Sequence, residues 1–201
     1  VLGIAGSRGL PVVEDAACAL GSEIEWHGAW ERIGRPRGSV ACFSLHPRKV
    51  VTTGDGGILT TRDAELARRF RLQRQHAMSI PDTIRHQSRS VVFEEYLEPA
   101  FNYRLTDIQA AVGRPQIARL DAIVAERRRL AAVYHHALSG NAVLAPPRER
   151  TGARTNWQSY PARLREGATG QAAVLQFLLD RGIACKRGVS NAHQEPAYRS
   201  R

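Results

Sequence analysis

The sequence predicts an α/β protein in which a doubly wound domain with a mostly parallel sheet is followed by the start of a smaller α/β domain. Short apolar runs of strand length alternate with longer stretches of helical period, as expected of a sheet covered by helices. A proline pair at residues 146–147 separates a longer first part from a shorter second part. At 201 residues the chain is long enough to bury a substantial core.

Three apolar runs are predicted to form strands of the first domain. They cover residues 10–13, 40–45 and 58–61. The first run ends at two carboxylates, Glu14 and Asp15, and the second leads into a polar turn at residues 44–49. Ligands of open α/β sheets bind beyond the carboxyl ends of the strands, so these two strand ends are the predicted site.

Three helices are predicted between this sheet and the proline pair. Asp63 caps the first helix, which runs to about residue 75. Residues 77–101 show no period and are predicted to form a long loop. Thr106 and Gln109 form a capping box that opens the second helix, and Pro115 is expected to kink or restart it. A long amphipathic helix follows, with a predicted apolar face made of Ile117, Leu120, Val124, Ala131, Val133 and Leu138.

The part of the chain beyond the proline pair is predicted to add two strands and one helix. The strands cover residues 157–164 and 183–186. The helix between them is capped by Thr169, ends at Arg181 and is stopped by Gly182, which can adopt the left-handed conformation. We therefore place the domain boundary between residues 144 and 145.

Composition and charge limit the classes of function. The net charge of +10 comes almost entirely from arginine, because Lys49 and Lys186 are the only lysines. The arginines are spread along helix faces without interleaved aromatic residues, which argues against nucleic-acid binding. No apolar run reaches the roughly 18 residues of a membrane span, and the first residues show no secretory signal. Three scattered cysteines suit neither a disulfide framework nor a metal site, so we expect a cytoplasmic protein without a bound metal.

Lys49 is the candidate nucleophile of the predicted site. An amine must lose its proton before it can condense with a carbonyl group, and the cationic neighbours His46 and Arg48 favour the neutral form. Asp15, at the neighbouring strand end, could pair with a pyridinium nitrogen, and Ser44 could offer its hydroxyl group to a phosphate. The spacing alone leaves other interpretations open. Lys49 could be a surface lysine in a turn, Asp15 a helix cap, and Ser44 a hydrogen-bonded residue at a strand end.

Four segments resemble the signature segments of the DegT/DnrJ/StrS family of sugar aminotransferases, and they follow the order found in that family. The segments are VEDAACALG at residues 13–21, CFSLHPRK at 42–49 with TGDGG at 53–57, NYRLTDIQAA at 102–111, and RGI at 181–183 with HQEPAY at 193–198. The resemblance covers roughly residues 10–198. It implies the type I fold of enzymes that depend on pyridoxal phosphate (PLP). In that fold, residues 1–144 would be the C-terminal portion of the large cofactor-binding domain, and residues 145–201 a partial small domain.

The resemblance also implies roles for individual residues. Lys49 would bind PLP covalently and act as general acid and base. Asp15 would pair with the pyridine nitrogen, and Ser44 would bind the phosphate. Cys18 would lie near the ring hydroxyl group, where many relatives have Gln or His. Asn102 would reach the cofactor phosphate of the neighbouring subunit, which implies a homodimer with shared sites. The residues that would line the sugar site are Arg104, His193 and Tyr198.

The implied reaction transfers an amino group, typically from glutamate, to a nucleotide-linked keto-sugar, for polysaccharides or glycosylated metabolites. One branch of the family replaces the lysine by histidine and dehydrates sugars, so Lys49 indicates transamination. The rival interpretations are a non-catalytic regulatory or scaffold protein that keeps the fold, and an inactive fragment of the enzyme. Family members are much longer, with a glycine-rich phosphate loop before residue 1 and the rest of the small domain after Arg201. We therefore expect weak or absent activity of this polypeptide alone.

Overall fold

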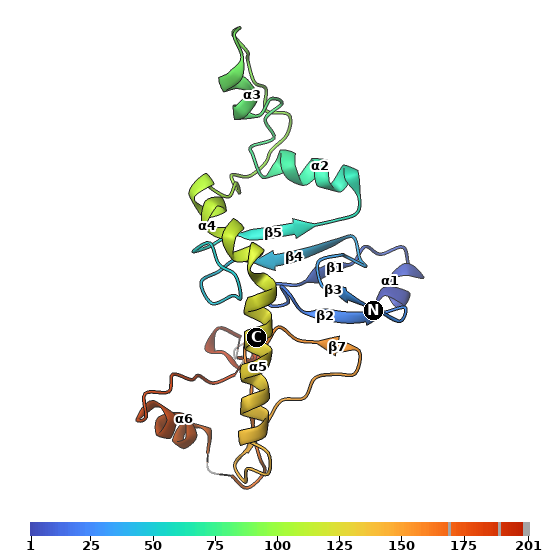
Figure 1. Ribbon diagram of the computed structural model, residues 1–201. Coiled ribbons are helices and arrows are strands. Elements are labelled where there is room, and N and C mark those ends of the chain that lie inside the picture. Colours follow the sequence, from blue (N-terminus) through green and yellow to red (C-terminus); the bar gives the residue numbers. More distant parts are fainter. Residues whose placement is uncertain (169, 189, 199–201) are drawn as a thin grey trace. The chain divides into compact units, whose positions relative to one another are not determined.

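The computed structural model describes residues 1–168, 170–188 and 190–198 (Figure 1). The elements, in chain order, are α1 Leu2–Gly6, β1 Val13–Asp15, β2 Glu23–Trp26, β3 Ala29–Arg32, β4 Val40–Ser44, β5 Gly57–Thr60, α2 Ala64–Gln73, α3 Asp82–Gln87, α4 Asp107–Ala118, α5 Leu120–Ala137, β6 Leu144–Ala145, β7 Ala153–Arg154, β8 Arg163–Leu164, α6 Gln171–Leu179, and the 3₁₀ helices η1 Ala192–Gln194 and η2 Pro196–Tyr198. Within the described part of the chain, no helix is both long and apolar enough to cross a membrane.

The chain divides into two compact units. The first consists of Val1–Arg127 with Arg150–Gln158, and the second of Arg128–Glu149 with Ser159–Arg201. The boundary between residues 144 and 145 was predicted for the domains of a longer protein, and it stays a prediction.

The first unit is built on a three-stranded sheet in the order β1-β4-β5. β1 runs parallel to β4, with Asp15 opposite Cys42. β5 runs antiparallel to β4, with Ser44 opposite Gly57. The predicted α/β class is confirmed, and the sheet, predicted to be mostly parallel, is parallel in part, since β1 and β4 are parallel and β5 is antiparallel. Because β1 and β4 are parallel, their carboxyl ends lie at the same edge of the sheet.

The first strand lies later in the sequence than predicted. The prediction ended it at Val13, whereas β1 begins there and includes both carboxylates. Val12 accepts a hydrogen bond from the backbone nitrogen of Ser39 at 2.8 Å just before the ladder begins. Leu10 is 58% exposed and contributes little to the core. Apolar character alone therefore misplaced the strand by about three residues.

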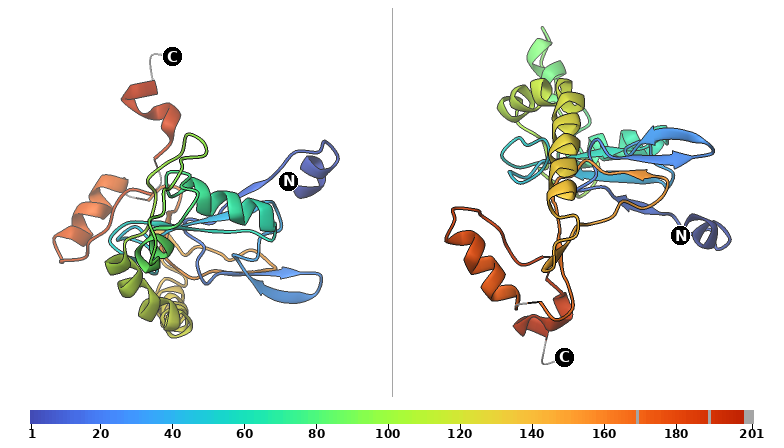
Figure 2. Two further views of the ribbon diagram at one scale, coloured as in Figure 1. Left: turned by 90° about the horizontal axis from the view of Figure 1, so that it is seen from above. Right: turned by 60° about the horizontal axis from the view of Figure 1, so that its bottom comes forward.

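The sequence did not predict the hairpin of β2 and β3, which projects from the first unit in both views of Figure 2. Its turn residues His27 and Gly28 have φ values of 50° and 79°, which is the left-handed pair that a two-residue hairpin favours. β7 pairs with the other edge of β2, where Glu23 lies opposite Arg154. These strands consist largely of charged and aromatic residues and none is fully buried, so they carry little apolar signal.

The core of the first unit consists of two small clusters. Residues of one cluster follow β4 and pack against the start of α5, namely Leu45, Val50, Val51, Leu120 and Val124. The other cluster contains Ala16, Ala41 and Phe43. Gly21 has a φ of 82°, and a Cβ atom there would lie 2.7 Å from Cγ2 of Val124. The loop after β1 can therefore approach α5 closely only because residue 21 has no side chain.

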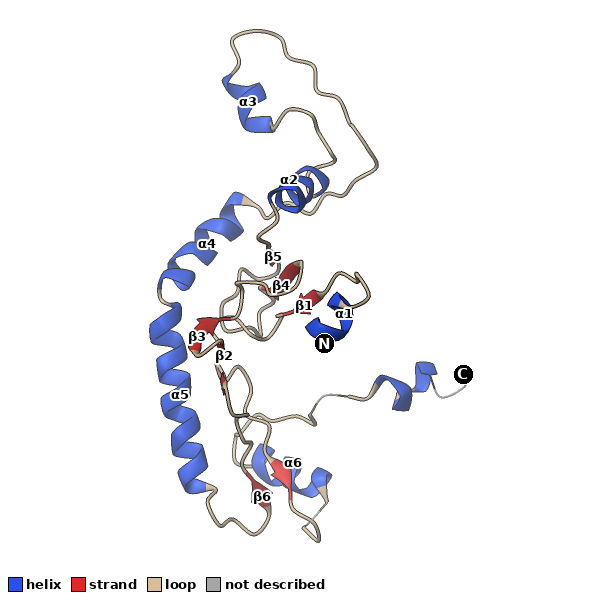
Figure 3. Cartoon of the chain, turned by 90° about the vertical axis from the view of Figure 1, so that its right-hand side faces the viewer, coloured by secondary structure: helices blue, strands red, loops and turns tan. Residues whose placement is uncertain are grey.

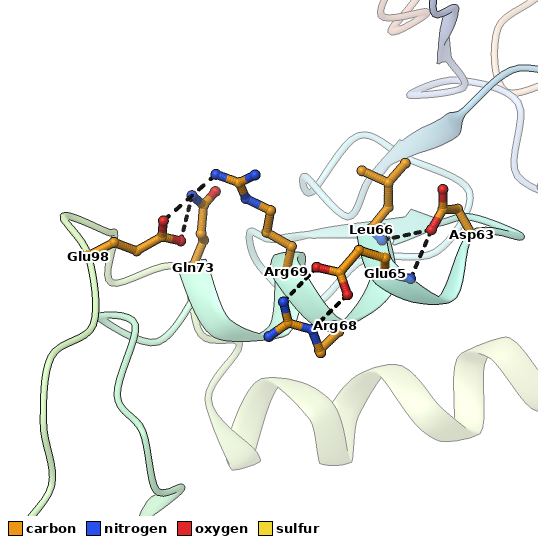
Figure 4. A network of polar contacts seen from close by, with 7 residues as sticks. All are labelled: Asp63, Glu65, Leu66, Arg68, Arg69, Gln73 and Glu98. Atoms are coloured by element: carbon orange, nitrogen blue, oxygen red, sulfur yellow. Dashed lines mark hydrogen bonds and ion pairs between the residues drawn. The ribbon is translucent and has the colours of Figure 1, made fainter.

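The predicted start of α2 is confirmed, and Figure 4 shows its polar contacts. The Asp63 carboxylate accepts hydrogen bonds from the backbone nitrogens of Glu65 and Leu66 at 2.8 and 3.0 Å. At the other end of the helix, Gln73 donates a hydrogen bond to Glu98 at 3.1 Å. This contact ties the helix to the chain that returns toward α4.

The capping box of α4 is confirmed, with Thr106 and Gln109 bonded to each other's backbone in both directions. The helix continues through Pro115 and breaks only at Arg119, after which α5 begins. The break is therefore four residues later than the proline suggested. On the predicted apolar face, Leu120, Val124 and Ala131 are buried and Leu138 is half-buried. The prediction was wrong for Ile117 and Val133, which are 43% and 54% exposed.

Residues 78–101, which we call the arm, form a long loop, as predicted (Figure 3). The arm also contains one short helix, α3, which was not predicted. The base of the arm is closed by a bridge between Met78 and Tyr96 and by a hydrogen bond from Leu97 N to Ala77 O at 3.0 Å. Farther out, Val91 and Phe93 are 82% and 84% exposed. The arm therefore presents apolar side chains to the outside of the unit.

The second unit confirms the predicted helix stop but not the predicted strands. α6 ends at Leu179, and Gly182 follows with a φ of 71°. The predicted cap, Thr169, lies outside the described residues. Of residues 157–164 only Arg163 and Leu164 form a strand, β8, which pairs with β6. The remainder of the predicted strand does not form, because Trp157 has a left-handed conformation (φ 50°) and Pro161 has no amide hydrogen to donate. Residues 183–186 are irregular, because Ile183 N bonds back to Leu178 O at the helix end.

Candidate active site at the carboxyl ends of β1 and β4

Only one of the two carboxylates of β1 faces the candidate site. Successive side chains of a strand point to opposite faces, so Glu14 and Asp15 diverge. Glu14 Oε1 accepts hydrogen bonds from the backbone nitrogens of Arg37 and Gly38 at 2.5 and 2.6 Å, and it fixes the turn before β4. Asp15 is exposed at the strand end, where its Oδ1 accepts a hydrogen bond from Ala17 N at 3.0 Å.

Lys49 lies on a tight turn between two buried anchors. Leu45 is 1% exposed, and its carbonyl oxygen accepts hydrogen bonds from Thr52 Oγ1 and Thr53 N at 2.9 and 3.1 Å. Val51, on the other side of Lys49, is fully buried. Because the chain is held on both sides, the intervening residues bulge toward the strand ends. Lys49 is half-buried there, and its backbone nitrogen bonds to His46 O at 2.9 Å.

The glycine-rich turn after Lys49 is fastened to α4. Gln116 Nε2 donates a hydrogen bond to Thr52 O at 2.7 Å, and its Oε1 accepts one from Thr52 N at 3.3 Å. Gln109 Nε2 reaches Asp55 O at 3.1 Å. Gly113 lies so close to Thr53 that a Cβ atom added at residue 113 would be 2.8 Å from the methyl group of Thr53. α4 therefore holds the turn that carries Lys49 in one conformation.

The amine of Lys49 contacts the thiol of Cys18. Nζ donates a hydrogen bond to Sγ at 3.1 Å, and this contact joins the turn after β4 to the loop after β1. The contact lowers the pKa of Cys18, and a side-chain hydrogen bond from Gln158 lowers it further. Desolvation and the nearby negative charge of Asp15 act in the opposite direction. Asp15, Cys18, Lys49 and Gln158 therefore form one cluster, in which an amine lies beside a thiol and near a carboxylate.

Gln158 and Asn156, two positions before it, were not predicted as site residues. Asn156 is 2% exposed, and its side chain bonds to the loop that carries Cys18. The predicted strand at residues 157–164 included Gln158 and began directly after Asn156, because the prediction treated this segment as a regular element. The adjacent polar residues Gln158 and Ser159 were the available signal against a buried strand.

The other predicted site residues lie in different surroundings. Ser44 is at the end of β4, where its Oγ accepts a hydrogen bond from His46 N at 3.3 Å. Asn102 pairs with Gln75 near the base of the arm. Arg104 is exposed in the segment before α4. The two remaining candidates belong to the second unit, His193 in η1 and Tyr198 in η2. The structure thus brings Asp15, Cys18 and Lys49 together, with Ser44 at the same edge of the sheet.

The described residues contain no group of three side chains that could hold a metal ion. The donor set of the cluster is instead an amine, a thiol, a carboxylate and, at the strand end, a hydroxyl group. This set suits an organic cofactor with an aldehyde, a basic ring nitrogen and a phosphate. The amine can condense with the aldehyde, the carboxylate can pair with the ring nitrogen, and the hydroxyl group can bond to the phosphate.

The chain belongs to the DegT/DnrJ/EryC1/StrS aminotransferase family, whose family model it matches over residues 1–201. Aminotransferases of this family are PLP-dependent transferases. The chain is 35% identical over 204 residues to GDP-perosamine synthase of Caulobacter vibrioides, and the match covers 98% of this chain and 50% of that protein.

Solved structures of aminotransferases share the fold. TlmJ of Streptoalloteichus hindustanus has a TM-score of 0.80 at 29% identity, and the match covers 98% of this chain and 49% of TlmJ. Helicobacter pylori PseC, an aminotransferase involved in pseudoaminic acid biosynthesis, has a TM-score of 0.85 at 25% identity. The match covers 100% of this chain and 51% of PseC. The chain thus spans about half the length of the relatives it matches, and its sequence is that of a sugar-aminotransferase family member.

Proposed function

We propose that this protein acts as a PLP-dependent aminotransferase that moves an amino group, with glutamate as donor, to a nucleotide-linked keto-sugar. The observation that carries the proposal is the amine of Lys49, held at the carboxyl ends of β1 and β4 by its contact with Cys18 and close to Asp15. Two relatives, GDP-perosamine synthase and an aminotransferase involved in the biosynthesis of pseudoaminic acid, support a sugar as the amino acceptor.

Each residue of the cluster would have a separate task. Bound PLP supplies an aldehyde that condenses with amines and a ring that accepts electrons. Lys49 Nζ would attach the cofactor and, as a free amine, take up and return a proton as general base and acid. The carboxylate of Asp15 would keep a proton on the ring nitrogen, and the hydroxyl group of Ser44 would bond to the phosphate. Cys18 would lie beside the ring. The proposed residues of the sugar site are Arg104, His193 and Tyr198.

The proposal includes a homodimer that acts in the cytoplasm. The exposed apolar side chains of the arm support self-association, because large exposed apolar patches mark interaction surfaces. Asn102 follows the arm directly, so a partner that binds there would lie close to it. We propose that Asn102 of one subunit binds the cofactor phosphate of the other. The three free cysteines support a reducing compartment.

The covalent role of Lys49 is tested by borohydride reduction in the presence of PLP, followed by peptide mapping. The chain offers a matched control, because Lys186 is its only other lysine. We expect a phosphopyridoxyl label on Lys49, loss of that label in Lys49→Arg, and full labelling in Lys186→Arg. Labelling of Lys186 alone, or of neither lysine, would contradict the proposal. In that case, unchanged binding of partner proteins by Lys49→Arg would point to a scaffold.

The shared site is tested by mixing two inactive variants of the same protein. Lys49→Ala and Asn102→Ala subunits each lack one part of every site. In a mixed dimer, one site combines the intact Lys49 of one subunit with the intact Asn102 of the other. We expect transaminase activity to reappear after subunit exchange. If the mixture stays inactive although mass spectrometry detects mixed dimers, Asn102 does not act across the interface.

A further inference from the structure

Asn156 is the most deeply buried polar side chain near the candidate site, with 2% of its surface exposed. Its Nδ2 donates hydrogen bonds to the carbonyl oxygens of Cys18 and Leu20, both at 2.9 Å. The backbone nitrogen of Asn156 donates to Ser22 Oγ at 3.0 Å. One residue therefore fixes the loop after β1 at three points.

The same side chain also shapes its own segment. Oδ1 of Asn156 accepts a hydrogen bond from Gln158 N at 2.9 Å, which closes a turn around Trp157. Trp157 has a φ of 50°, and Arg127 Nη1 donates to its carbonyl oxygen at 3.1 Å. This turn fixes the backbone of Gln158, whose side chain contributes to lowering the pKa of the Cys18 thiol. Asn156 thus holds the loop of Cys18 directly, through the carbonyl oxygen of Cys18, and also fixes the segment that carries Gln158.

An asparagine suits this position better than a similar residue would. Both amide hydrogens are used by carbonyl oxygens and the amide oxygen by a backbone nitrogen, so the side chain is satisfied on both sides. Aspartate has the same shape but no donor, and it would place a carboxylate against two carbonyl oxygens. Alanine would leave both partly buried carbonyl groups without their donor.

We propose that Asn156 is a positioning residue of the cofactor site. It holds the loop that carries Asp15 and Cys18 against Gln158, so that the Cys18 thiol remains in contact with the Lys49 amine. The link to the cofactor rests on the function proposed above. The link to Cys18 does not, because it is argued from the hydrogen bonds of Asn156 and Lys49 alone.

The test measures the alkylation of Cys18 by iodoacetamide as a function of pH, in the protein without PLP. Cys42→Ser and Cys185→Ser leave Cys18 as the only thiol. We expect Asn156→Ala and Gln158→Ala each to move the midpoint of the profile to higher pH and to slow alkylation at neutral pH several-fold. Asn141→Ala is the matched control, since the side chain of Asn141 also bonds to the backbone at two points, but in the second unit, where its Oδ1 accepts hydrogen bonds from Val143 N and Leu144 N at 2.8 Å. It should leave the profile unchanged.

The outcomes separate positioning from simple stabilisation. If Asn156→Ala is folded by circular dichroism and keeps the parent profile, its role is only structural and the proposal is overturned. If that variant does not fold, Gln158→Ala decides, because it removes the group that Asn156 positions and leaves the buried amide in place. An unchanged profile in Gln158→Ala overturns the proposal as well.

PLP binding gives a second readout. Asn156→Ala should bind PLP more weakly than the parent, while borohydride still labels Lys49. If PLP labels no lysine in the parent, the proposed function fails, but the thiol profile still tests Asn156. The two proposals can therefore fail independently.

Discussion

At the scale of single residues, the contact between Lys49 and Cys18 is the most informative feature of the chain. The sequence placed Lys49 and Asp15 at neighbouring strand ends because each follows a short apolar run, and the structure has Asp15 at the end of β1, which runs parallel to β4. It did not identify Asn156 or Gln158. Their contacts with the loop after β1 join residues 138 positions apart, and no local pattern encodes such a pairing. A polar residue in an irregular segment can be predicted, but its partner cannot.

The reactivity of Cys18 is expected to depend on Lys49. The amine lowers the pKa of the Cys18 thiol, so the reactive thiolate is present at lower pH than for an ordinary cysteine. Replacement by Lys49→Met should raise the midpoint of the alkylation profile, whereas Lys186→Met should not. Mass spectrometry of iodoacetamide-treated protein distinguishes the three cysteines. Faster labelling of Cys42 or Cys185 than of Cys18 at neutral pH would contradict this expectation.

The same shift has a consequence for stability. The pKa of Cys18 is lower in the folded state than in the unfolded chain, so ionisation of this thiol stabilises the fold. The contribution is complete at pH values above the pKa of the unfolded chain. It is lost as the pH falls through the pKa of the folded state. Because Cys18 is exposed, solvent screens the interaction and the effect should be small. Denaturation of the parent and Cys18→Ser at several pH values measures it.

At the scale of elements, the capped starts of α2 and α4 could be predicted, whereas the short helix α3 and several strands could not. A helix start is encoded within four residues, as in the cap of Asp63 and the box of Thr106 with Gln109. A strand requires a partner that the local sequence does not specify. The predicted strand at residues 183–186 has apolar residues but no paired neighbour among the described residues, whereas the hairpin of β2 and β3 pairs without an apolar pattern.

Removal of the cap of α2 should destabilise the first unit. Asp63→Ala leaves the backbone nitrogens of Glu65 and Leu66 without their acceptor, and the expected loss is about 0.5–2 kcal/mol. Asp63→Ser keeps an acceptor and should retain most of the stability. Urea denaturation followed by circular dichroism compares the three proteins. Equal stability of the alanine variant and the parent would mean that α2 does not unfold with the rest of the unit.

The packing of α4 on the glycine-rich turn predicts an unusual effect of a glycine replacement. Alanine normally stabilises a helix relative to glycine by about 1 kcal/mol. Gly113→Ala should instead destabilise by about 1–3 kcal/mol, because the new methyl group would overlap the methyl group of Thr53. Gly3→Ala in α1, where a Cβ atom meets nothing within 4 Å, should cause no loss. A gain in melting temperature for Gly113→Ala would show that Thr53 can move aside.

At the scale of the whole molecule, the exposed arm predicts self-association. Phe93 is 84% exposed, so Phe93→Asp should leave the fold of a single chain unchanged and weaken the proposed dimer. Leu179→Asp, at a residue of α6 that is 61% exposed, is the control for a charge placed outside the arm. Sedimentation velocity reports the result. A dimer that persists unchanged in Phe93→Asp would place the interface elsewhere.

The hydrogen bonds of Asn156 also set an order of events during protein synthesis. The ribosome completes the loop that carries Cys18 long before it reaches residue 156, and N-terminal segments begin to fold first. Until then, the two carbonyl oxygens that the amide will bind can only be hydrated. The part of the site that Asn156 and Gln158 form beside Cys18 is therefore assembled late. By then, most of the first unit has already emerged from the ribosomal tunnel.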